Sequence, residues 1–272
     1  HVVMACRSLD RGEDAMADIR ESVSAASLTL SELDLADLDS VRRFADEFAA
    51  EHGSLHVLCN NAGVMAIPRR ETAQGFETQF GVNHLGHFAL SARLFPTLRD
   101  TPGETRLVTM SSGLHERGRM EFDDLQGERD YDEWDAYAQS KLSNLLFAFE
   151  LDRRLTAAGI DDVLSVGAHP GYAATNLQLR GPEASGSTLR YWMSKLGNAI
   201  FAQSAEMGAL PLLYAATSPA VESGEYVGPQ GLFGMRGTPG IAEPSDRARD
   251  PETAARLWEV SEELTDTRFR LA

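Results

Sequence analysis

The stretch TRLVTMSS, residues 105–112, is a short, mostly apolar run that ends in two serines. Comparable runs lie on either side of it along the chain, HVLCNNAG at 56–63 and DVLSVGAHPG at 162–171. Long amphipathic patterns, at residues 76–98 and 133–158, separate these runs. Because short apolar runs that alternate with helical patterns are typical of βαβ units, the sequence predicts a parallel sheet with helices on both faces.

The same alternation starts at the first residues of the chain. VVMAC at 2–6 precedes a helical pattern at 10–23, and LTLSEL at 28–33 precedes a second one at 40–52. Four residues of that second pattern recur at helical spacing and are expected in the core: Val41, Phe44, Ala45 and Phe48. With 272 residues and no linker-like stretch, the chain is predicted to be one doubly wound α/β domain over residues 1–272. The glycine-rich stretch 228–240 is predicted to be a surface loop.

The chain is acidic, with 41 acidic and 25 basic residues and a formal net charge of −16. This charge argues against a nucleic-acid partner. Only two of the basic residues are lysines, Lys141 and Lys195, which fits either a halophilic protein from a salty cytoplasm or a GC-rich genome that prefers arginine codons. No apolar run reaches the roughly 18 to 20 residues that span a bilayer. We therefore expect a cytoplasmic protein without a membrane or nucleic-acid partner.

Two pairs of residues raise the question of a disulfide or a metal site. Cys6 and Cys59 both lie within apolar runs, so we expect buried free thiols and no disulfide. His84 and His87 could be mistaken for a metal pair, but no third ligand accompanies them. We expect these histidines to occupy a helix face and predict no metal site.

Tyr137 and Lys141 are four residues apart in the helical pattern at 133–158, so their side chains leave the same face of the helix. An ammonium group beside a phenol stabilises the phenolate and lowers its pKa from about 10 toward neutral pH. The pair is therefore a candidate general acid and base. The same spacing also occurs by chance in many helices, so the pair needs support from other motifs.

That support comes from a series of motifs in a fixed order, which resembles the short-chain dehydrogenase/reductase family. The motifs are Asn60-Asn61-Ala62-Gly63, the serine pair at 111–112, Tyr-x-x-x-Lys at 137–141 and Pro170-Gly171. VNHLGHFAL at 82–90, FDDLQGE at 122–128, YAQSKLSNLLF at 137–147 and HPGYAATNL at 169–177 are similar to the branch of retinol dehydrogenases and protochlorophyllide reductases. The resemblance covers nearly the whole chain and implies a Rossmann-type fold and an oxidoreductase.

Residue by residue, the resemblance implies a catalytic role for four side chains. Tyr137 would donate or accept the proton, and Lys141 would tune the pKa of Tyr137 and bind the cofactor ribose. Ser112 would hydrogen-bond the substrate oxygen, with Ser111 as the competing choice. Asn83 would hold a water molecule in the proton relay.

The resemblance also implies a nicotinamide cofactor. Its binding residues would be Asp34 and Leu35 near the adenine, Asn61, Ala62 and Gly63 near the adenosine ribose, and Pro170, Gly171 and Thr175 on the nicotinamide side. The choice between NAD and NADP depends on the end of the first apolar run, where a carboxylate favours NAD and an arginine attracts the 2′-phosphate of NADP. Here the run ends at neutral Cys6 and is followed by Arg7 and Ser8. We therefore prefer NADP(H), with NAD(H) as the alternative, and Arg7 as a solvated loop charge is the competing interpretation.

Two regions bear on how far the family pattern applies. The family's first strand and glycine-rich turn, T-G-x-x-x-G-x-G, do not occur in these residues, so we expect one βα unit of about 25 to 35 residues to precede His1. Residues 177–201 are amphipathic and stand where the family carries a segment that covers the substrate, which favours a lipophilic substrate. Packing against the body of the domain would explain the same apolar residues.

The leading hypothesis is an NADP(H)-dependent enzyme that transfers a hydride between the cofactor and a small-molecule carbonyl or alcohol. A reductase of C=C bonds with the same four residues is the near alternative, and a cofactor-binding sensor or scaffold without turnover is the alternative from another class. A homodimer is one option, because the patterns at 76–98 and 133–158 resemble the helices that pair subunits in the family.

Overall fold

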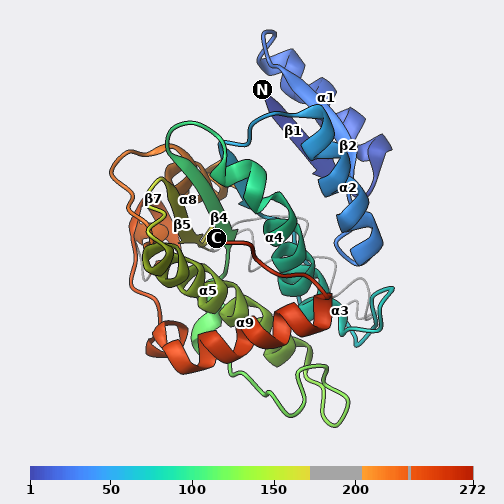
Figure 1. Ribbon diagram of the computed structural model, residues 1–272, viewed down its shortest axis with the longest axis vertical. Coiled ribbons are helices and arrows are strands. Elements are labelled where there is room, and N and C mark those ends of the chain that lie inside the picture. The colour runs from blue at the N-terminus through green and yellow to red at the C-terminus, as the bar shows by residue number, and fades with distance from the viewer. Residues whose placement is uncertain (172–203, 232–233, 272) are drawn as a thin grey trace.

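The computed structural model describes residues 1–171, 204–231 and 234–271. Its strands are β1 (Val2–Cys6), β2 (Leu28–Glu32), β3 (Val57–Asn60), β4 (Thr105–Met110), β5 (Val163–Ala168), β6 (Tyr226–Gly231) and β7 (Arg236–Ile241). β3, β4, β5 and β6 pair in parallel in that order, and β7 adds an antiparallel edge. The predicted α/β fold with a parallel sheet in a single domain is confirmed (Figure 1).

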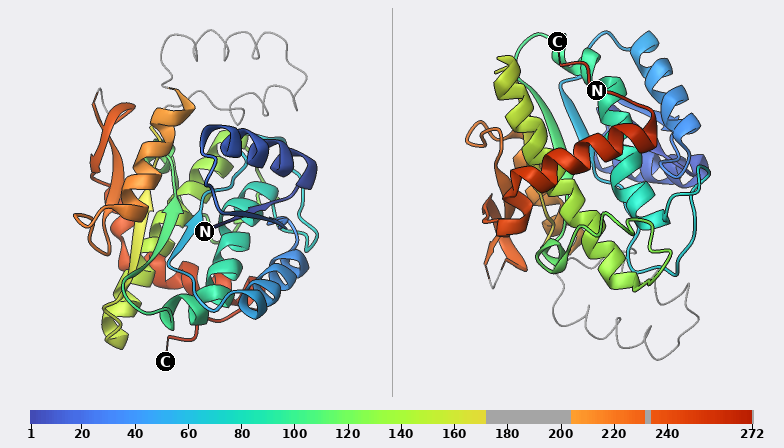
Figure 2. Two further views of the ribbon diagram at one scale, coloured as in Figure 1. Left: turned by 90° about the horizontal axis from the view of Figure 1, so that it is seen from above. Right: turned by 60° about the horizontal axis from the view of Figure 1, so that its bottom comes forward.

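Helices cover both faces of this sheet (Figure 2). The helices that contact it are α4 (Gly86–Arg99), α5 (Glu133–Ala158) and α8 (Ala205–Thr217). The other described helices are α1 (Leu9–Ser22), α2 (Leu38–Glu51), α3 (Thr78–Phe80) and α9 (Pro251–Thr265). Successive residues of β4 show the two faces, because Leu107 packs in the cluster that includes Phe88 and Phe147, whereas Val108 packs in the cluster that includes Ala215 of α8. All residues of β4 and β5 are buried, as expected for central parallel strands.

Local signals explain where α5, the longest described helix, begins and ends. The carboxylate of Asp132 accepts hydrogen bonds from the backbone N–H groups of Trp134 and Asp135, which have no partner within the helix. Gly159 ends the helix with a φ of 69°, a left-handed conformation that glycine adopts without strain. The bounds of α5 agree with the predicted pattern at 133–158.

The pattern at 76–98 was expected to be one helix, and the structure divides it. α3 leads into a π-helical turn, η1 (Gly81–Leu85), before α4 begins. Asn83 lies in this turn, and its side chain binds the backbone of Val64 on the loop after β3. Single π-helical turns are frequent at functional sites, where they redirect a side chain.

Among the described residues, the strands form two separate sheets. β1 pairs with β2 alone, and β3 pairs with β4 alone, so each has one edge without a strand partner. This position explains why one prediction is wrong: Cys59 of β3 is exposed, and Cys6 of β1 is only half-buried, although both thiols are free as expected. The additional βα unit stays a prediction.

The stretch 228–240 was predicted to be a surface loop, and this prediction is wrong. Most of the stretch belongs to strands β6 and β7. Glycine and proline have low strand propensity, but this pair lies at the antiparallel edge of the sheet, where they are tolerated. Gly228 also has a packing reason, since a Cβ atom there would collide with the Nε2 atom of His169.

α9 crosses the outer side of α4 and α5 (Figures 1 and 2). Trp258 stacks on Phe147 of α5 at 5.8 Å and meets Phe88 of α4 edge-on at 5.4 Å, and Phe269 extends this aromatic cluster. The outer side of the two helices that were expected to pair subunits is therefore covered by the chain itself. A homodimer stays a prediction.

Candidate functional site

The carboxyl ends of β3, β4 and β5 lie at one edge of the sheet, because these strands are parallel. Open α/β sheets bind their ligands at this edge. The loop after β3 begins at Asn61, the loop after β4 begins at Ser111, and the loop after β5 begins at His169. α5 packs against β4 and β5 and carries Tyr137 and Lys141 to the same place.

Lys141 is buried, with only 4% of its surface exposed. Its Nζ atom donates a hydrogen bond to the carbonyl oxygen of Met110 at 3.2 Å and lies 5.8 Å from the centre of the Tyr137 ring. Burial lowers the pKa of Lys141 to about 8, because the charged form loses its hydration. An ammonium group has three donors, so this contact leaves capacity for ligand hydroxyl groups.

Tyr137 is also buried, and burial raises its pKa to about 12, while a hydrogen bond with the Ser112 side chain opposes the rise. The net shift is therefore upward, and the expected lowering of this pKa by Lys141 stays a prediction. Loss of hydration is the main cause of the rise, and the Lys141 ammonium group, 5.8 Å from the ring centre, donates its hydrogen bond to the Met110 carbonyl. Tyr137 is therefore a protonated acid at neutral pH.

The two serines after β4 have different contacts. The Ser111 hydroxyl donates to the carbonyl oxygen of Lys141 at 2.7 Å and is buried, so it ties β4 to α5. The Ser112 hydroxyl accepts from the backbone N–H of Leu114 at 3.2 Å and also bonds Tyr137. This geometry favours Ser112 over Ser111 as the serine that meets the substrate oxygen.

Asn83 is fully buried and its side chain has three hydrogen bonds. Its Oδ1 atom accepts from the backbone N–H of Val64 at 2.7 Å, and its Nδ2 atom donates to the Val64 carbonyl and to the Ser140 hydroxyl. The side chain thus joins the loop after β3 to α5. The Asn83 carbonyl accepts from His87 Nδ1 at 2.9 Å, and the role of Asn83 in a water relay stays a prediction.

The loop after β3 lies against the catalytic residues. A Cβ atom on Gly63 would be 3.1 Å from Asn83 Oδ1 and 3.4 Å from Lys141 Nζ, so glycine permits the close approach. Asn61 and Ala62 are exposed beside it, free to meet a ligand. At the end of β5, Gly171 has a φ of 65°, and a Cβ there would collide with the carbonyl of Met235. Pro170 precedes it, whereas Thr175 and the segment 177–201 lie outside the described residues.

The predicted adenine-side residues follow β1 and β2. Asp34 is half-buried, and its Oδ1 atom accepts from the backbone N–H of Ala36, which fixes the turn; Leu35 is buried and packs closely against Gly86 of α4. Arg7 is exposed after β1, and Ser8 follows it before α1. Within the described part of the chain, the Arg7 guanidinium has no hydrogen bond or ion pair, so it is available to an anion.

The two suspected metal ligands have other partners. His84 Nε2 lies 2.8 Å from the Ser261 hydroxyl, and His87 Nδ1 bonds the Asn83 carbonyl. Burial lowers the pKa of His84 to about 3 and that of His87 to about 4, so both are neutral. Over the described ranges, no group of histidine, cysteine, aspartate or glutamate residues is arranged to hold a metal ion.

Sequence reasoning missed a second layer of three aromatic side chains. Tyr226 of β6 stacks on His169 at 5.0 Å and meets His115 edge-on at 5.5 Å. The His115 Nδ1 atom lies 2.7 Å from the Ser112 carbonyl. Only His115 carried a usable signal, because it stands three residues after Ser112, the spacing at which a side chain reaches back to a turn carbonyl.

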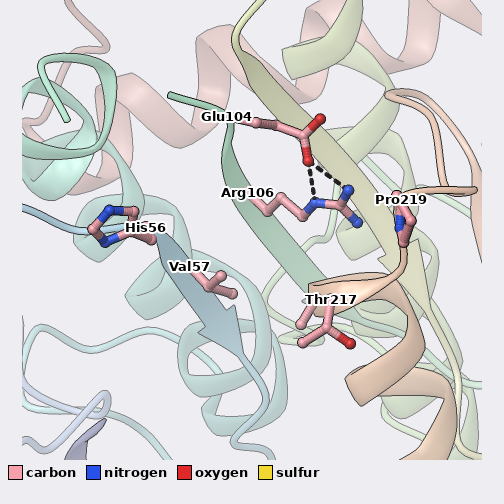
Figure 3. Close-up of a pocket in the computed structure, with 7 residues that line it drawn as sticks. His56, Val57, Glu104, Arg106, Thr217 and Pro219 are labelled. Carbon is pink, nitrogen blue, oxygen red and sulfur yellow. Dashed lines mark hydrogen bonds and ion pairs between the residues drawn. The ribbon is translucent and has the colours of Figure 1, made fainter. Parts of the chain in front are cut away.

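A cavity of about 190 Å³ lies at the opposite end of the sheet (Figure 3). Arg106, near the start of β4, lines it and is bonded to Glu104 and to the Ala215 carbonyl. The candidate catalytic residues lie at the other end of β4, so this cavity is not part of the candidate site.

Among the helices that the structure describes, none combines the length and the apolar character that a membrane span needs.

Comparison with known proteins agrees with this geometry. The family described as short chain dehydrogenase matches residues 1–184. Mouse retinol dehydrogenase 12 is 39% identical over 265 residues, covering 97% of this chain and 78% of the relative. Mouse polyprenol dehydrogenase is 41% identical over 269 residues, covering 97% of this chain and 76% of the relative.

Solved structures give the same result. A protein of Mycobacterium paratuberculosis has a TM-score of 0.77 and 42% identity, covering 99% of this chain and 85% of that protein. L-sorbose reductase of Gluconobacter frateurii, solved with NADPH and L-sorbose, has a TM-score of 0.62 at 16% identity over 83% of this chain and 84% of that chain, which supports the fold alone. The chain therefore belongs to the short-chain dehydrogenase family, in its retinol-dehydrogenase-like branch, and is an oxidoreductase that uses a nicotinamide cofactor.

Proposed function

We propose that this enzyme transfers a hydride between NADP(H) and a lipophilic carbonyl or alcohol. The observation that carries the proposal is the meeting of Ser112, Tyr137 and Lys141 at the carboxyl end of β4. A phenol, a hydroxyl and a buried ammonium group at one point are suited to bind a carbonyl oxygen and to supply its proton.

The residues fit a nicotinamide cofactor on two counts. Glycine at position 63 leaves room beside Lys141 Nζ, and the ammonium group retains donors for ribose hydroxyl groups. When bound, the cofactor supplies or accepts the hydride, which no protein side chain can do.

The protein's own part is to bind the substrate oxygen and to move one proton. The Ser112 hydroxyl donates to the oxygen and holds it beside Tyr137. Tyr137, protonated because its pKa is raised to about 12, gives its proton to that oxygen during reduction. The phenolate that remains is stabilised by the nearby Lys141 charge, and the same groups take the proton back in oxidation.

Preference for NADP(H) over NAD(H) rests on the end of β1. Arg7 follows neutral Cys6, is exposed, and has no ion pair within the described ranges. A guanidinium group there attracts a 2′-phosphate, whereas a carboxylate would repel it. Ser8 at the start of the same turn can add a hydroxyl contact.

The substrate class is drawn from the relatives. Their names specify retinol and polyprenol, both long apolar alcohols. A lipophilic substrate agrees with the apolar composition of segment 177–201. Reduction of a C=C bond is the second candidate, because the same phenol could protonate carbon.

A cytoplasmic location and a halophilic origin stay predictions.

The test uses the full chain with NADPH or NADH and a series of aldehydes from short to long. We expect turnover with NADPH that increases with apolar length, and loss of turnover in Tyr137→Phe with cofactor binding retained. Tyr131→Phe is the control, because that phenol bonds Glu77 and Ile67 instead of the catalytic residues. Unchanged turnover in Tyr137→Phe, or binding of neither cofactor, would overturn the proposal.

A further inference from the structure

Residues 242–249, which connect β7 to α9, lie against the turn that follows the catalytic serine. That turn is a 3₁₀ helix, η2 (Gly113–Arg117), and Ser112 is its N-terminal cap. The backbone N–H of Ser245 donates to His115 Nε2 at 3.1 Å. The Arg247 guanidinium donates to the carbonyl oxygens of Glu116 and Gly118 at 3.3 Å each. We call residues 242–249 the strap.

His115 joins the strap to Ser112. It is 1% exposed, and its Nδ1 atom lies 2.7 Å from the Ser112 carbonyl oxygen, which can only accept, so Nδ1 carries the proton. Nε2 is then unprotonated and accepts from Ser245. The two contacts require the same neutral tautomer, which makes the ring a fixed bridge.

The orientation of Ser112 depends on this turn. Its carbonyl accepts from both the backbone and the side chain of His115, at 3.0 and 2.7 Å, and its hydroxyl accepts from the backbone N–H of Leu114. The turn also touches α5, because a Cβ atom on Gly118 would be 2.5 Å from the carbonyl oxygen of Ala138, the residue after Tyr137. A shift of the turn would therefore move Ser112 relative to Tyr137.

We propose that the strap positions Ser112 for catalysis, with His115 as the positioning residue that transmits the contact from Ser245. The catalytic part of this inference rests on the proposed function, because it treats Ser112 as the group that binds the substrate oxygen. Small misplacements of a catalytic group lower rates strongly, so contacts well outside the reacting atoms matter.

Ser245 offers a matched pair of variants. Its φ is −64°, a value that proline can adopt, so Ser245→Pro removes the N–H that donates to His115 and puts the proline Cδ in its place, which pushes the His115 ring away from the strap. Ser245→Ala keeps this N–H and removes a hydroxyl that has no partner within the described residues. We expect Ser245→Pro to lower kcat by about three- to tenfold with the KM for NADPH unchanged, and Ser245→Ala to match the unmodified chain.

Amide hydrogen exchange gives a readout that needs no turnover. Exchange at the Leu114 amide reports its bond with the Ser112 hydroxyl, and we expect faster exchange in Ser245→Pro than in Ser245→Ala. If Ser245→Pro and Ser245→Ala have the same exchange rate at Leu114 and the same kcat, with active sites counted by cofactor binding, the proposed role of the strap is wrong. Altered exchange in a chain that shows no turnover in any variant would overturn the proposed function but keep the physical contact. A lower melting temperature with unchanged kcat would reduce His115 to a structural residue and reject the proposal.

Discussion

The Lys141 ammonium group lies 5.8 Å from the centre of the Tyr137 ring and is held there by the carbonyl of Met110. The charge is thus fixed to the end of β4, not to the phenol itself. With the phenol's pKa raised to about 12, the resting site holds an acid, and Lys141 acts chiefly once the phenolate forms. The catalytic pair is arranged to stabilise the product of proton transfer.

Replacement of Lys141 by methionine tests whether the lysine charge stabilises the phenolate of Tyr137. Methionine keeps most of the buried volume and removes the charge that stabilises the phenolate, so we expect kcat to fall by roughly 10²- to 10⁴-fold. A pH profile of kcat checks the result. Lys141→Arg is the control: a rate close to that of the unmodified chain would mean that any positive charge suffices, contrary to the compact fit beside Gly63.

The serine pair can be separated by two alanine variants. Ser112→Ala removes the hydroxyl that bonds Tyr137, and we expect a fall in kcat of about 10²-fold. Ser111→Ala leaves the buried carbonyl of Lys141 without this donor, so we expect a loss of about 1–3 kcal/mol in the free energy of unfolding and a smaller effect on kcat. Steady-state kinetics and urea unfolding of both variants provide the measurement. The reverse order of the kcat effects would reassign the catalytic serine to Ser111.

Charge reversal at Arg7 tests the cofactor preference. Arg7→Glu places a carboxylate after β1, so we expect NADPH to bind about 10- to 100-fold more weakly and NADH to bind more tightly. Fluorescence titration of both cofactors at low and high salt measures the change. Arg268→Glu makes the same charge change at an exposed position near the C-terminus and should alter neither affinity. Equal effects of the two variants would mean that only overall charge matters.

Glycine at position 63 is expected to be needed for cofactor binding. A Cβ atom would crowd Asn83 Oδ1 and Lys141 Nζ, so Gly63→Ala should raise the KM for the cofactor several-fold by displacing the ammonium group. Gly53→Ala, at a position with open space around the new Cβ, is the matched control. If the two variants have the same KM, the loop after β3 is not a cofactor contact.

Because several histidines are buried in their neutral form, we expect the fold to lose stability in mild acid. Burial lowers the pKa of His84 to about 3 and those of His87 and His169 to about 4, well below the ordinary value of 6.5. The unfolded chain therefore binds more protons below pH 6.5, and stability present above that pH is lost as the pH falls toward 4. We expect the free energy of unfolding to drop by on the order of 3 kcal/mol between pH 6.5 and 5.5, measured by urea unfolding in high salt.

His84→Gln is the informative variant for this prediction. The glutamine amide can replace the contact between His84 Nε2 and Ser261 without a titrating group. We expect a smaller dependence on pH in this variant, because one of the buried histidines that set it is gone. An unaltered slope would show that His84 is not among the groups that set it.

The alternation of apolar runs and helical patterns predicted the parallel sheet and α5 closely, because burial of both faces leaves a strong periodic signal. The pattern gave no warning of the π-helical turn at Asn83, which depends on a distant contact with Val64. The pKa of Tyr137 could not be predicted from the sequence either. Helical spacing places Lys141 nearby, but the loss of hydration that raises this pKa depends on the packing of the whole domain. The strap contact at His115 joins residues 130 positions apart, and local sequence carries no trace of it.

The edges of β1 and β3 that have no strand partner among the described residues bear on how the chain behaves in concentrated solution. Val2 and Cys59 are exposed on these strands, and an edge strand is a template for pairing with another molecule. The net charge of −16 keeps molecules apart at low ionic strength, and salt screens that repulsion over distances beyond about 10 Å at 0.1 M. A chain in which these edges stay open should therefore aggregate more as salt is added, through growth of intermolecular β-structure, whereas the predicted βα unit, placed between β1 and β3, would remove this template.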